Sequence, residues 1–342
     1  MFIVQSAVVK GRGGIATAVS HYERMFRELG LRSAVLFSGP SLEALQAQGG
    51  DVIAAPKLLT SPISGPLTLF GQLREQLLQR AAGEPIVAIV HSDLTLPALK
   101  RILPRARFVA PCHSDKFKHK EAADVVITLN TAQHAAARAA LAKPRVIQLG
   151  NPYVADAPPP ITADGPPRLN FVARFTPTKD PLALLRAAAG LPSPPSLRYF
   201  GDGELAPEAR AAAAASQLDV EFVGWHSAPF SQFHRRDILV LPSHWEGLPY
   251  LLQEALDHGV PAIASDVAGN RTALGDGEFG HLYRLGDDGA LTAALAEALA
   301  NLDALRVKAE KGRAALRPRY GATAFWRVLS AELDQVGERR HA

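Results

Sequence analysis

The sequence is poor in sulfur and has no long apolar run. It contains one cysteine, Cys112, and two methionines among 342 residues. A single cysteine excludes a disulfide within the chain and is typical of a reducing compartment. No apolar run reaches the roughly 18 residues needed to cross a bilayer. The apolar segment 2–9 follows no basic residues and leads into a glycine turn, so we expect a first strand rather than a signal peptide, and a cytoplasmic protein.

The sequence also lacks the patterns that are typical of zinc sites and of nucleic-acid-binding surfaces. The eleven histidines are not spaced with the cysteine in the way that zinc ligands are. Basic residues are spread along the chain, and no platform of basic and aromatic residues stands out, so nucleic-acid binding is not expected.

The net charge of +4 hides an asymmetry. Residues 1–150 contain 18 Lys and Arg against 10 Asp and Glu, whereas the remainder contains 19 against 23. The basic N-terminal half and its segment KFKHK at 116–120 indicate an anionic partner, such as a phospholipid surface or a phosphate-bearing acceptor. A solvated basic surface with no partner fits the same counts.

The length favours two domains, and short apolar runs alternating with helical stretches predict two doubly wound α/β domains in tandem. We expect a Rossmann-like domain over 1–152, a second over 153–320 after a linker rich in proline, and a helix over 321–342 that packs back on the first domain. Ligands bind at the carboxyl ends of the strands in such sheets, so the site should be assembled from both domains at an interdomain cleft.

The expected elements are short and regularly spaced. The expected strands are 1–9, 32–37, 52–55, 86–90, 107–110, 125–128, 146–149, 169–172, 197–200, 220–223, 238–241 and 261–265. The expected helices are 15–29, 66–82, 181–189, 204–217, 230–235, 248–258, 291–301, 302–316 and 322–336.

The densest functional signal is the segment SHWEGLPYLLQEALDHGVP at 243–261. Glu246 and Glu254 are eight residues apart, which on a helix is about 12 Å of rise. They are therefore expected to hold the two ends of one elongated ligand rather than one atom. Glu246 would lie at the helix mouth, beside the backbone N–H groups of Gly247 and Leu248.

A basic pair flanks the loop after the expected strand 169–172. Arg174 and Lys179 combine a rigid guanidinium with a flexible ammonium, which suits the charge of a diphosphate. Taken alone, the two residues are also compatible with an ordinary exposed basic pair.

Gly13 and Gly14 lie between the first strand and the first helix, where backbone can approach an anion. With Gly11 and Ala16 they also fit the G-x-G-x-x-G/A pattern of dinucleotide-binding proteins. That pattern needs an acid near the end of the second strand, where this sequence has Phe37 and Ser38. An NAD(P)-dependent oxidoreductase is therefore a minor alternative.

Two histidines follow neighbouring expected strands. His91 comes after strand 86–90 and His113 after strand 107–110, so both are expected at the edge of the cleft. Cys112 precedes His113, but no base and orienting acid form a pattern for a thiol nucleophile around it.

These motifs resemble the large retaining family 4 of glycosyltransferases with the GT-B fold, and the resemblance covers nearly the whole chain. Glu246 and Glu254 match the E-x7-E motif of that family. The other matching pieces are Gly13 to Ala16, the two strand-end histidines, Val172 to Lys179, Gly201 to Glu204 and Val223 to Trp225.

The resemblance implies a role for each site residue. Glu246, with the N–H groups of Gly247 and Leu248, holds the donor sugar, and Glu254 binds the ribose hydroxyls. Arg174 and Lys179 bind the diphosphate, and Gly13 with Gly14 closes on phosphate or acceptor. In the family the histidine after the later strand lies beside the reacting sugar, so His113, rather than His91, is assigned with Glu246 to the catalytic centre. It would orient or stabilise groups while the leaving phosphate helps to deprotonate the acceptor.

The implied function is a retaining transferase that moves a hexose-type sugar from a UDP- or GDP-sugar to a hydroxyl of a glycan or lipid-linked acceptor. Cell-surface polysaccharide or lipopolysaccharide synthesis, peripheral at the inner face of the plasma membrane, fits this reaction. The alternative is a non-catalytic sugar-nucleotide-binding or partner subunit. The sequence has no Asp-x-Asp, the metal-binding motif of the other common glycosyltransferase fold, so no metal or other cofactor is expected.

Three features depart from the family pattern, at four positions. Asp180 stands where the family usually has glycine after the lysine, which puts the turn of that loop in question. Leu248 and Pro249 replace the commoner phenylalanine and glycine. Thr272 occupies a place where many relatives carry glutamate.

Overall fold

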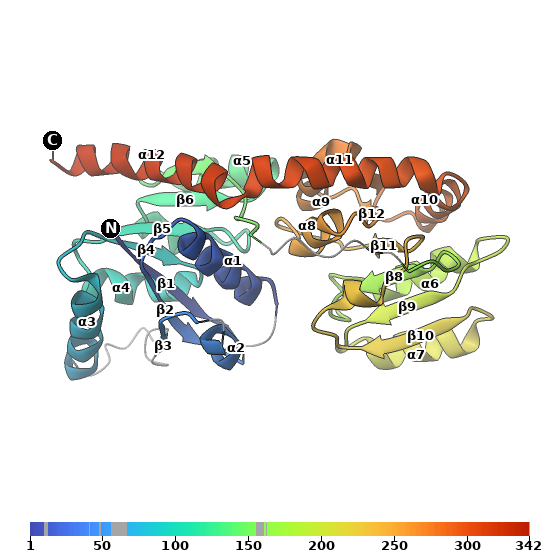
Figure 1. The fold of residues 1–342 in the computed structure, drawn as a ribbon, viewed down its shortest axis with the longest axis horizontal. Coiled ribbons are helices and arrows are strands. Elements are labelled where there is room, and N and C mark those ends of the chain that lie inside the picture. The colour runs from blue at the N-terminus through green and yellow to red at the C-terminus, as the bar shows by residue number, and fades with distance from the viewer. Residues whose placement is uncertain are drawn as a thin grey trace. The chain divides into compact units, whose positions relative to one another are not determined.

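The computed structural model describes residues 1–9, 13–40, 42–47, 49–55, 67–154, 161 and 163–341. The chain divides into two compact units, shown in Figure 1. Unit 1 comprises residues 1–155 and 317–342, and unit 2 comprises residues 156–316. Gly11 of the glycine turn and the linker prolines at 158–160 lie outside the described residues.

Unit 1 contains a seven-stranded parallel sheet with the order β3-β2-β1-β4-β5-β6-β7. All seven strands expected in this part of the sequence are present. Central strands such as β4, with the sequence IVAIV, are buried along their whole length, which explains their continuous apolar runs. The strands are β1 (Phe2–Val8), β2 (Ser33–Ser38), β3 (Val52–Ala54), β4 (Ile86–Val90), β5 (Arg107–Pro111), β6 (Val125–Thr128) and β7 (Arg145–Gln148).

Helices cover this sheet, and the C-terminal helix of the chain is one of them. In unit 1, α12 packs Phe325 and Leu329 into the same core as Tyr22 and Phe26 of α1. The helices are α1 (Gly14–Glu28), α2 (Leu42–Ala47), α3 (Leu67–Ala81), α4 (Leu96–Ile102), α5 (Thr131–Ala140) and α12 (Ala322–His341), with the 3₁₀ turns η2 (Asp93–Thr95) and η3 (Lys120–Ala122).

Unit 2 repeats the architecture with six parallel strands in the order β10-β9-β8-β11-β12-β13. Its core joins apolar residues of the sheet with those of α6, α7 and α10. The strands are β8 (Leu169–Val172), β9 (Leu197–Phe200), β10 (Val220–Gly224), β11 (Ile238–Leu241), β12 (Ala262–Ser265) and β13 (His281–Tyr283). The strand β13, with the sequence HLY, was not anticipated, because it is short and contains no apolar run.

Two expected helices of unit 2 differ from the structure. The helix predicted over 230–235 was wrong, because the chain there forms only the 3₁₀ turn η4 (Pro229–Gln232). The helix predicted over 248–258 begins two residues later, at Tyr250. The helices are α6 (Pro181–Ala189), α7 (Ala206–Ala215), α8 (Tyr250–Asp257), α9 (Ala268–Ala273), α10 (Asp288–Ala300) and α11 (Leu302–Tyr320), whose last turn lies in unit 1, with the 3₁₀ turn η5 (Gly275–Gly277).

Each sheet has one topological switch point, where the chain leaves two adjacent strands toward opposite sides. In unit 1 it lies between β1 and β4, and in unit 2 between β8 and β11. Ligands of doubly wound sheets bind beside the carboxyl ends of the strands at this point. No helix among the described residues is long and apolar enough to cross a bilayer.

Candidate functional site

The loops after β8 and β11 meet at the switch point of unit 2. Lys179, from the first loop, donates a hydrogen bond to Glu246, from the second, with 2.5 Å between Nζ and Oε1. The side chain of Glu246 is only 8% exposed and that of Lys179 is 23% exposed. The fold therefore brings together two of the residues assigned from the sequence, 67 positions apart.

Glu246 is held in place through its own backbone. A Cβ atom on Gly269, in α9, would lie 2.3 Å from the carbonyl oxygen of Glu246, so only glycine permits this approach. The start of the same loop is held by two further hydrogen bonds. The hydroxyl of Ser265 donates to the carbonyl of Ser243, and the side-chain amide of Asn270 donates to the carbonyl of Ser265 at 2.9 Å. These supporting residues were missed in the sequence, because their contacts come from the folding of α9 against the loop.

Glu246 precedes α8 and is not part of it. The expected helical spacing of Glu246 and Glu254 was therefore wrong, since only Glu254 lies on a helix. Glu254 is partly buried in the middle of α8. The helix ends at Asp257, and Gly259 terminates it, as the sequence indicates. Gly259 has φ +67°, and the N–H of the next residue, Val260, donates to the carbonyl of Ala255 at 2.8 Å.

The loop that carries Arg174 is braced by the segment Gly201 to Gly203. The N–H of Phe175 donates to the carbonyl of Asp202 at 2.9 Å. A Cβ atom on Gly201, which has φ +130°, would lie 1.9 Å from the carbonyl oxygen of Ala173. These glycines therefore fix the backbone on either side of Arg174. The Arg174 side chain itself is exposed, so its guanidinium is accessible to a ligand.

Asp180 keeps the turn that glycine would make. Its backbone is left-handed, with φ +41° and ψ +69°, a conformation that aspartate tolerates better than most residues. Its carboxylate caps α6 by accepting from the N–H of Ala183 at 3.1 Å. Thr272, a second departure, donates its hydroxyl to the carbonyl of Ala268 within α9 at 2.9 Å.

In unit 1, Gly13 and Gly14 begin α1 beside the switch point. A Cβ atom on either residue would have no described neighbour within 4 Å beyond the adjoining backbone. The φ of Gly13 is 167°, which is extended backbone open to any residue. Within the described part of unit 1, neither packing nor backbone geometry calls for glycine at these positions, which favours the close approach of another molecule.

His91 and His113 lie side by side at the ends of β4 and β5. His91 Nδ1 is 2.9 Å from His113 Nε2, and the two rings are stacked. Burial lowers the pKa of His91 well below 6.5. Burial and the charge of Lys120 lower the pKa of His113 to about 3. Both imidazoles are therefore neutral at physiological pH.

Two residues near His113 are buried and have structural rather than catalytic roles. Cys112 is fully buried, and burial raises the pKa of its thiol to about 12, so it is not a nucleophile. Lys120, from the basic segment 116–120, is 1% exposed, paired with Asp93 and bound to the carbonyl of Lys116. The expected basic surface therefore loses one of its charges to the interior of unit 1.

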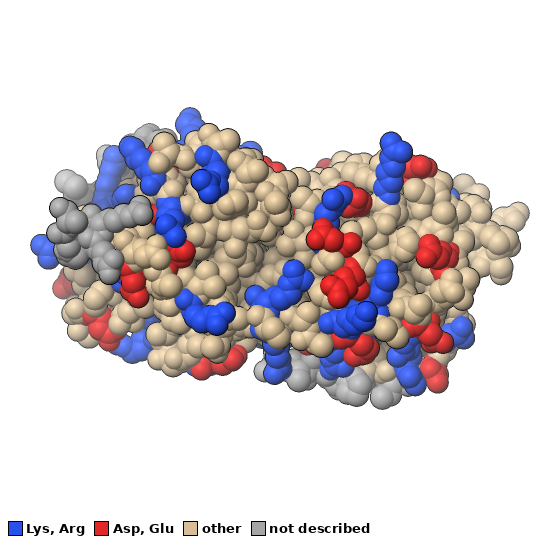
Figure 2. Space-filling model, turned by 90° about the horizontal axis from the view of Figure 1, so that it is seen from above, with Lys and Arg blue, Asp and Glu red and all other residues tan. Residues whose placement is uncertain are grey.

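The remaining charge is dispersed on the face that Figure 2 shows. Among the described side chains on that face, Lys and Arg are interleaved with Asp and Glu and do not merge into one basic area. Within the described ranges, no group of three or more His, Cys, Asp and Glu side chains is arranged to hold a metal ion. The absence of a metal from the reaction stays a prediction.

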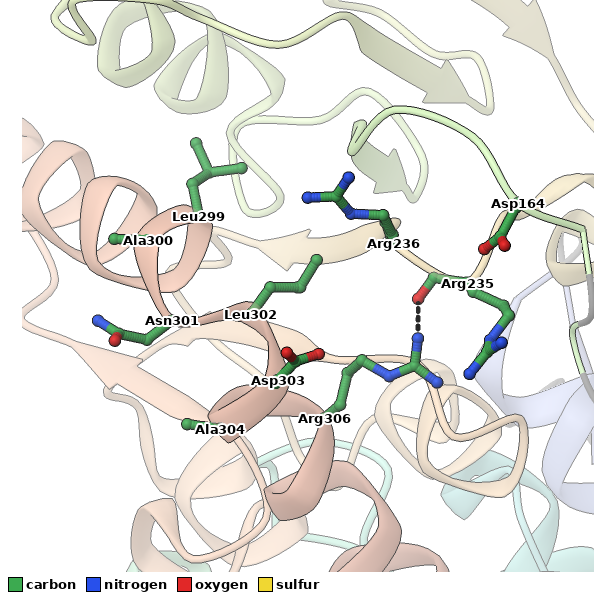
Figure 3. Close-up of a pocket in the computed structure, with 10 residues that line it drawn as sticks. All are labelled: Asp164, Arg235, Arg236, Leu299, Ala300, Asn301, Leu302, Asp303, Ala304 and Arg306. Carbon is green, nitrogen blue, oxygen red and sulfur yellow. Dashed lines mark hydrogen bonds between the residues drawn. The ribbon is translucent and has the colours of Figure 1, made fainter.

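Unit 2 has a hollow that is separate from the candidate site. It has a volume of about 540 Å³ and lies where α10 meets α11 (Figure 3). Arg306 reaches across it to donate to the carbonyl of Arg235 at 2.7 Å. Arg235 precedes β11 and Glu246 follows it, so the hollow lies at the opposite end of this strand.

Comparisons with known proteins match part of the chain to a family model and nearly all of it to a known fold. Residues 157–314 match the family model described as glycosyl transferases group 1. The UDP-Gal:alpha-D-GlcNAc-diphosphoundecaprenol alpha-1,3-galactosyltransferase of Escherichia coli is 32% identical over 127 residues, which cover 34% of this chain and 32% of that protein. The D-inositol 3-phosphate glycosyltransferase of Thermobispora bispora is 33% identical over 185 residues, covering 49% and 42% of the two chains. The chain thus spans less than half the length of either relative.

Similarity to solved structures extends over nearly the whole chain. HepE from Anabaena, crystallised with UDP and glucose, has a TM-score of 0.77 at 16% identity, covering 98% of this chain and all of that one. The lipopolysaccharide outer core galactosyltransferase WaaB has a TM-score of 0.71 at 19% identity, covering 98% and 99%. At these identities the similarity shows the fold alone.

Proposed function

Because residues 157–314 match the model of the glycosyl transferases group 1 family and the chain has the two-domain GT-B fold, we propose that this protein is a retaining glycosyltransferase. It transfers a hexose-type sugar from a nucleotide diphosphate sugar to a hydroxyl of a glycan or lipid-linked acceptor. The observation that carries this proposal is the contact between Lys179 and Glu246 at the switch point of the matching unit.

Each assigned residue of unit 2 has a place in the proposed donor site. Lys179 and the exposed Arg174 bind the diphosphate and stabilise the charge that develops on it. Glu246 binds hydroxyls of the sugar next to the diphosphate, together with the backbone of Gly247 and Leu248. Glu254, further along in α8, binds the ribose.

Unit 1 supplies the remaining assignments. We assign Gly13 and Gly14 to a phosphate or to the acceptor, since no described contact within the unit calls for glycine there. We assign His113 to the reacting sugar, where its neutral imidazole orients a hydroxyl. These roles are part of the proposal and follow from the family resemblance.

The proposed reaction exchanges one bond for another at the anomeric carbon. The acceptor oxygen forms a bond to C1 of the donor sugar while the bond between C1 and the diphosphate oxygen breaks. The electron pair of that bond leaves with the nucleotide diphosphate, and an oxygen of the leaving phosphate takes the proton of the acceptor. Because attack and departure occur on one face of the sugar, the configuration at C1 is retained.

Several relatives support a UDP-sugar and a cell-surface glycan. The Escherichia coli relative is named for UDP-Gal and a diphosphoundecaprenol-linked acceptor, and HepE was crystallised with UDP and glucose. We therefore propose a UDP-hexose as the first donor to test and a polyprenol-linked or lipopolysaccharide acceptor. An acceptor of that kind would place the protein at the cytoplasmic face of a membrane as a peripheral protein.

The test is turnover of nucleotide sugars, followed as release of UDP or GDP. UDP-galactose, UDP-glucose and GDP-mannose are each supplied with a polyprenol-diphosphate-linked N-acetylglucosamine or with lipopolysaccharide core. We expect one UDP-sugar to turn over, and Lys179→Ala and Glu254→Ala each to lower kcat/KM by about 10²-fold or more. The controls Glu208→Ala on α7 and Lys311→Ala on α11, both exposed, should retain activity. Unchanged turnover in both site variants would refute the assignment.

A further inference from the structure

A continuous chain of hydrogen bonds runs through the interior of unit 1 and ends at His113. Glu23 of α1 accepts from Gln5 Nε2 at 2.5 Å. Gln5 Oε1 is 2.8 Å from His91 Nε2, and His91 Nδ1 is 2.9 Å from His113 Nε2. The side chains of Gln5, His91 and Glu23 are 0%, 2% and 7% exposed, so water does not compete for these bonds.

The carboxylate at one end fixes the direction of every bond in the chain. An ionised Glu23 only accepts hydrogen bonds, and a second donor, the hydroxyl of Ser33, reaches its other oxygen at 3.0 Å. The amide of Gln5 must therefore turn its nitrogen to Glu23 and its oxygen to His91. That oxygen accepts, so His91 carries its proton on Nε2.

The tautomer of His91 fixes that of His113 in turn. A neutral imidazole holds one proton, so His91 Nδ1 is an acceptor. His113 must then donate from Nε2, which leaves its own Nδ1 without a proton. Within the described part of the chain, Nδ1 of His113 makes no hydrogen bond to another residue. Burial lowers the pKa of both rings, which agrees with neutral imidazoles at His91 and His113.

We propose that Gln5 and Glu23 are positioning residues that fix the tautomer of His113, so that its Nδ1 is a hydrogen-bond acceptor for a substrate hydroxyl. The identity of that hydroxyl rests on the proposed function, where the ligand is a sugar donor or a glycan acceptor. The tautomer itself follows from the bonds within unit 1 at any pH where Glu23 is ionised, that is, above its pKa, which burial raises from 4.5. A neutral acceptor orients a hydroxyl without donating a proton to the leaving group.

Packing around this chain of hydrogen bonds holds its residues in place. The edge of the Tyr22 ring contacts His91, with the ring centroids 4.9 Å apart and an interplanar angle of 80°. On β1, Gln5 bonds to α1 and His91, whereas the next residue, Ser6, lies 3.1 Å from the hydroxyl of Thr95. Ser6 is as buried as Gln5 but takes no part in the chain, which makes it a matched control.

The charge of Glu23 is the element to test. In Glu23→Gln the new amide can present either its nitrogen or its oxygen to Gln5, because the hydroxyl of Ser33 can donate or accept. The direction of the chain is then no longer fixed. The double variant Gln5→Glu with Glu23→Gln restores it, since the carboxylate at position 5 accepts from both sides and the amide at position 23 donates.

The primary measurement is ¹⁵N NMR of the full-length protein labelled at histidine, which reports which ring nitrogen carries the proton. We expect the Nε2–H tautomer for His91 and His113 in the wild type, a mixture in Glu23→Gln, and Nε2–H again in the double variant and in Ser6→Ala. An Nδ1–H tautomer of His113 in the wild type would overturn the proposal, as would a Glu23→Gln spectrum identical to the wild type. The wild-type spectrum needs no variant to fold.

Turnover provides the second readout. With the responsive nucleotide sugar, Glu23→Gln should lower kcat about tenfold or more, because a histidine in the wrong tautomer loses its function even in intact geometry. The double variant should recover most of the lost kcat. Ser6→Ala should retain most of the wild-type kcat. Equal losses in Glu23→Gln and Ser6→Ala would mean that burial, not tautomer, matters, and would overturn the proposal. If no nucleotide sugar turns over in the wild type, the proposed function fails while the spectra still decide the tautomer.

Discussion

Lys179 Nζ lies 2.5 Å from Glu246 Oε1 and joins the loops that follow β8 and β11. The contact places a cation suited to a diphosphate directly beside a carboxylate suited to sugar hydroxyls. In a nucleotide sugar the diphosphate is bonded to the sugar, so the two protein groups are as close as their proposed ligands are. The pair also compensates the charge of Glu246, which is nearly buried.

Removing Lys179 should destabilise unit 2. In Lys179→Met the carboxylate of Glu246 loses its partner while the aliphatic stem is kept. Unpaired charges in fully buried pairs cost about 3–5 kcal/mol; because Lys179 retains access to water, we expect about 2 kcal/mol. Urea denaturation measures the change, and adding Glu246→Gln to Lys179→Met should restore part of the loss. A single variant as stable as the wild type would show that the pair contributes nothing.

Asp180 allows its two structural roles to be separated. Asp180→Ala loses the cap of α6, worth about 1 kcal/mol, and keeps a Cβ in left-handed backbone without the local hydrogen bond that makes this conformation tolerable for aspartate. Asp180→Gly relieves the backbone and also caps tolerably, so it should cost only a few tenths of a kcal/mol. Denaturation of both variants, with hydrogen exchange at α6, checks the ranking. Equal losses in the two variants would contradict a left-handed Asp180.

Glycine substitutions should separate stability from activity. Gly14→Ala adds a methyl group with no described neighbour within 4 Å and should stabilise α1 by up to about 1 kcal/mol while lowering turnover. Gly269→Ala places the methyl group 2.3 Å from the carbonyl oxygen of Glu246 and should lower both stability and donor affinity. Melting temperatures and donor Kd values measure the two effects. Full activity in Gly14→Ala would remove Gly14 from the site.

The buried histidines predict a loss of stability in mild acid. Burial lowers the pKa of His21 to about 4, that of His113 to about 3, and that of His91 well below 6.5. Between these values and 6.5 the unfolded chain binds protons that the folded chain does not, so the free energy of unfolding falls as pH falls below 6.5. Above 6.5 all three groups are neutral in both states and contribute no slope.

Glu23 acts in the opposite direction over part of this range. Burial raises its pKa above 4.5, so the folded state binds its proton more readily, and this contribution to stability is lost as pH rises past the raised value. The three histidines together change the free energy of unfolding over this pH range more than Glu23 does. Thermal unfolding between pH 8 and pH 5.5 should therefore show a falling melting temperature, and a melting temperature that is constant or rises toward pH 5.5 would contradict the buried neutral histidines.

Much of the fold was readable because parallel strands buried on both faces leave continuous apolar runs. Such runs predict β4 and β11 to the residue. The 3₁₀ turn at Pro229–Gln232 resembles a helix in sequence because its apolar residues pack locally, and the pattern does not show that the chain stops after one turn. The strand β13 is formed by pairing with β12 rather than by its own three residues.

The candidate site was readable where one residue type suits one ligand group, as with Lys179 and Glu246. Its support was not, because the need for glycine at position 269 arises only when α9 approaches the loop before α8. One overlooked signal was available: Gln5 and Ser6 are polar residues inside the apolar strand β1, and buried polar groups require partners. That interruption marks the chain of bonds that leads to His113.

The most direct test of a nucleotide-sugar site is a thermal-shift panel on the full-length protein with UDP, GDP, their sugars and NADH. At about 100 times its Kd, a ligand that binds the folded state should stabilise it by roughly 2.7 kcal/mol. We predict a shift with UDP and a UDP-hexose that is lost in Lys179→Ala and in Glu254→Ala. A shift with NADH and none with UDP or GDP would contradict the account.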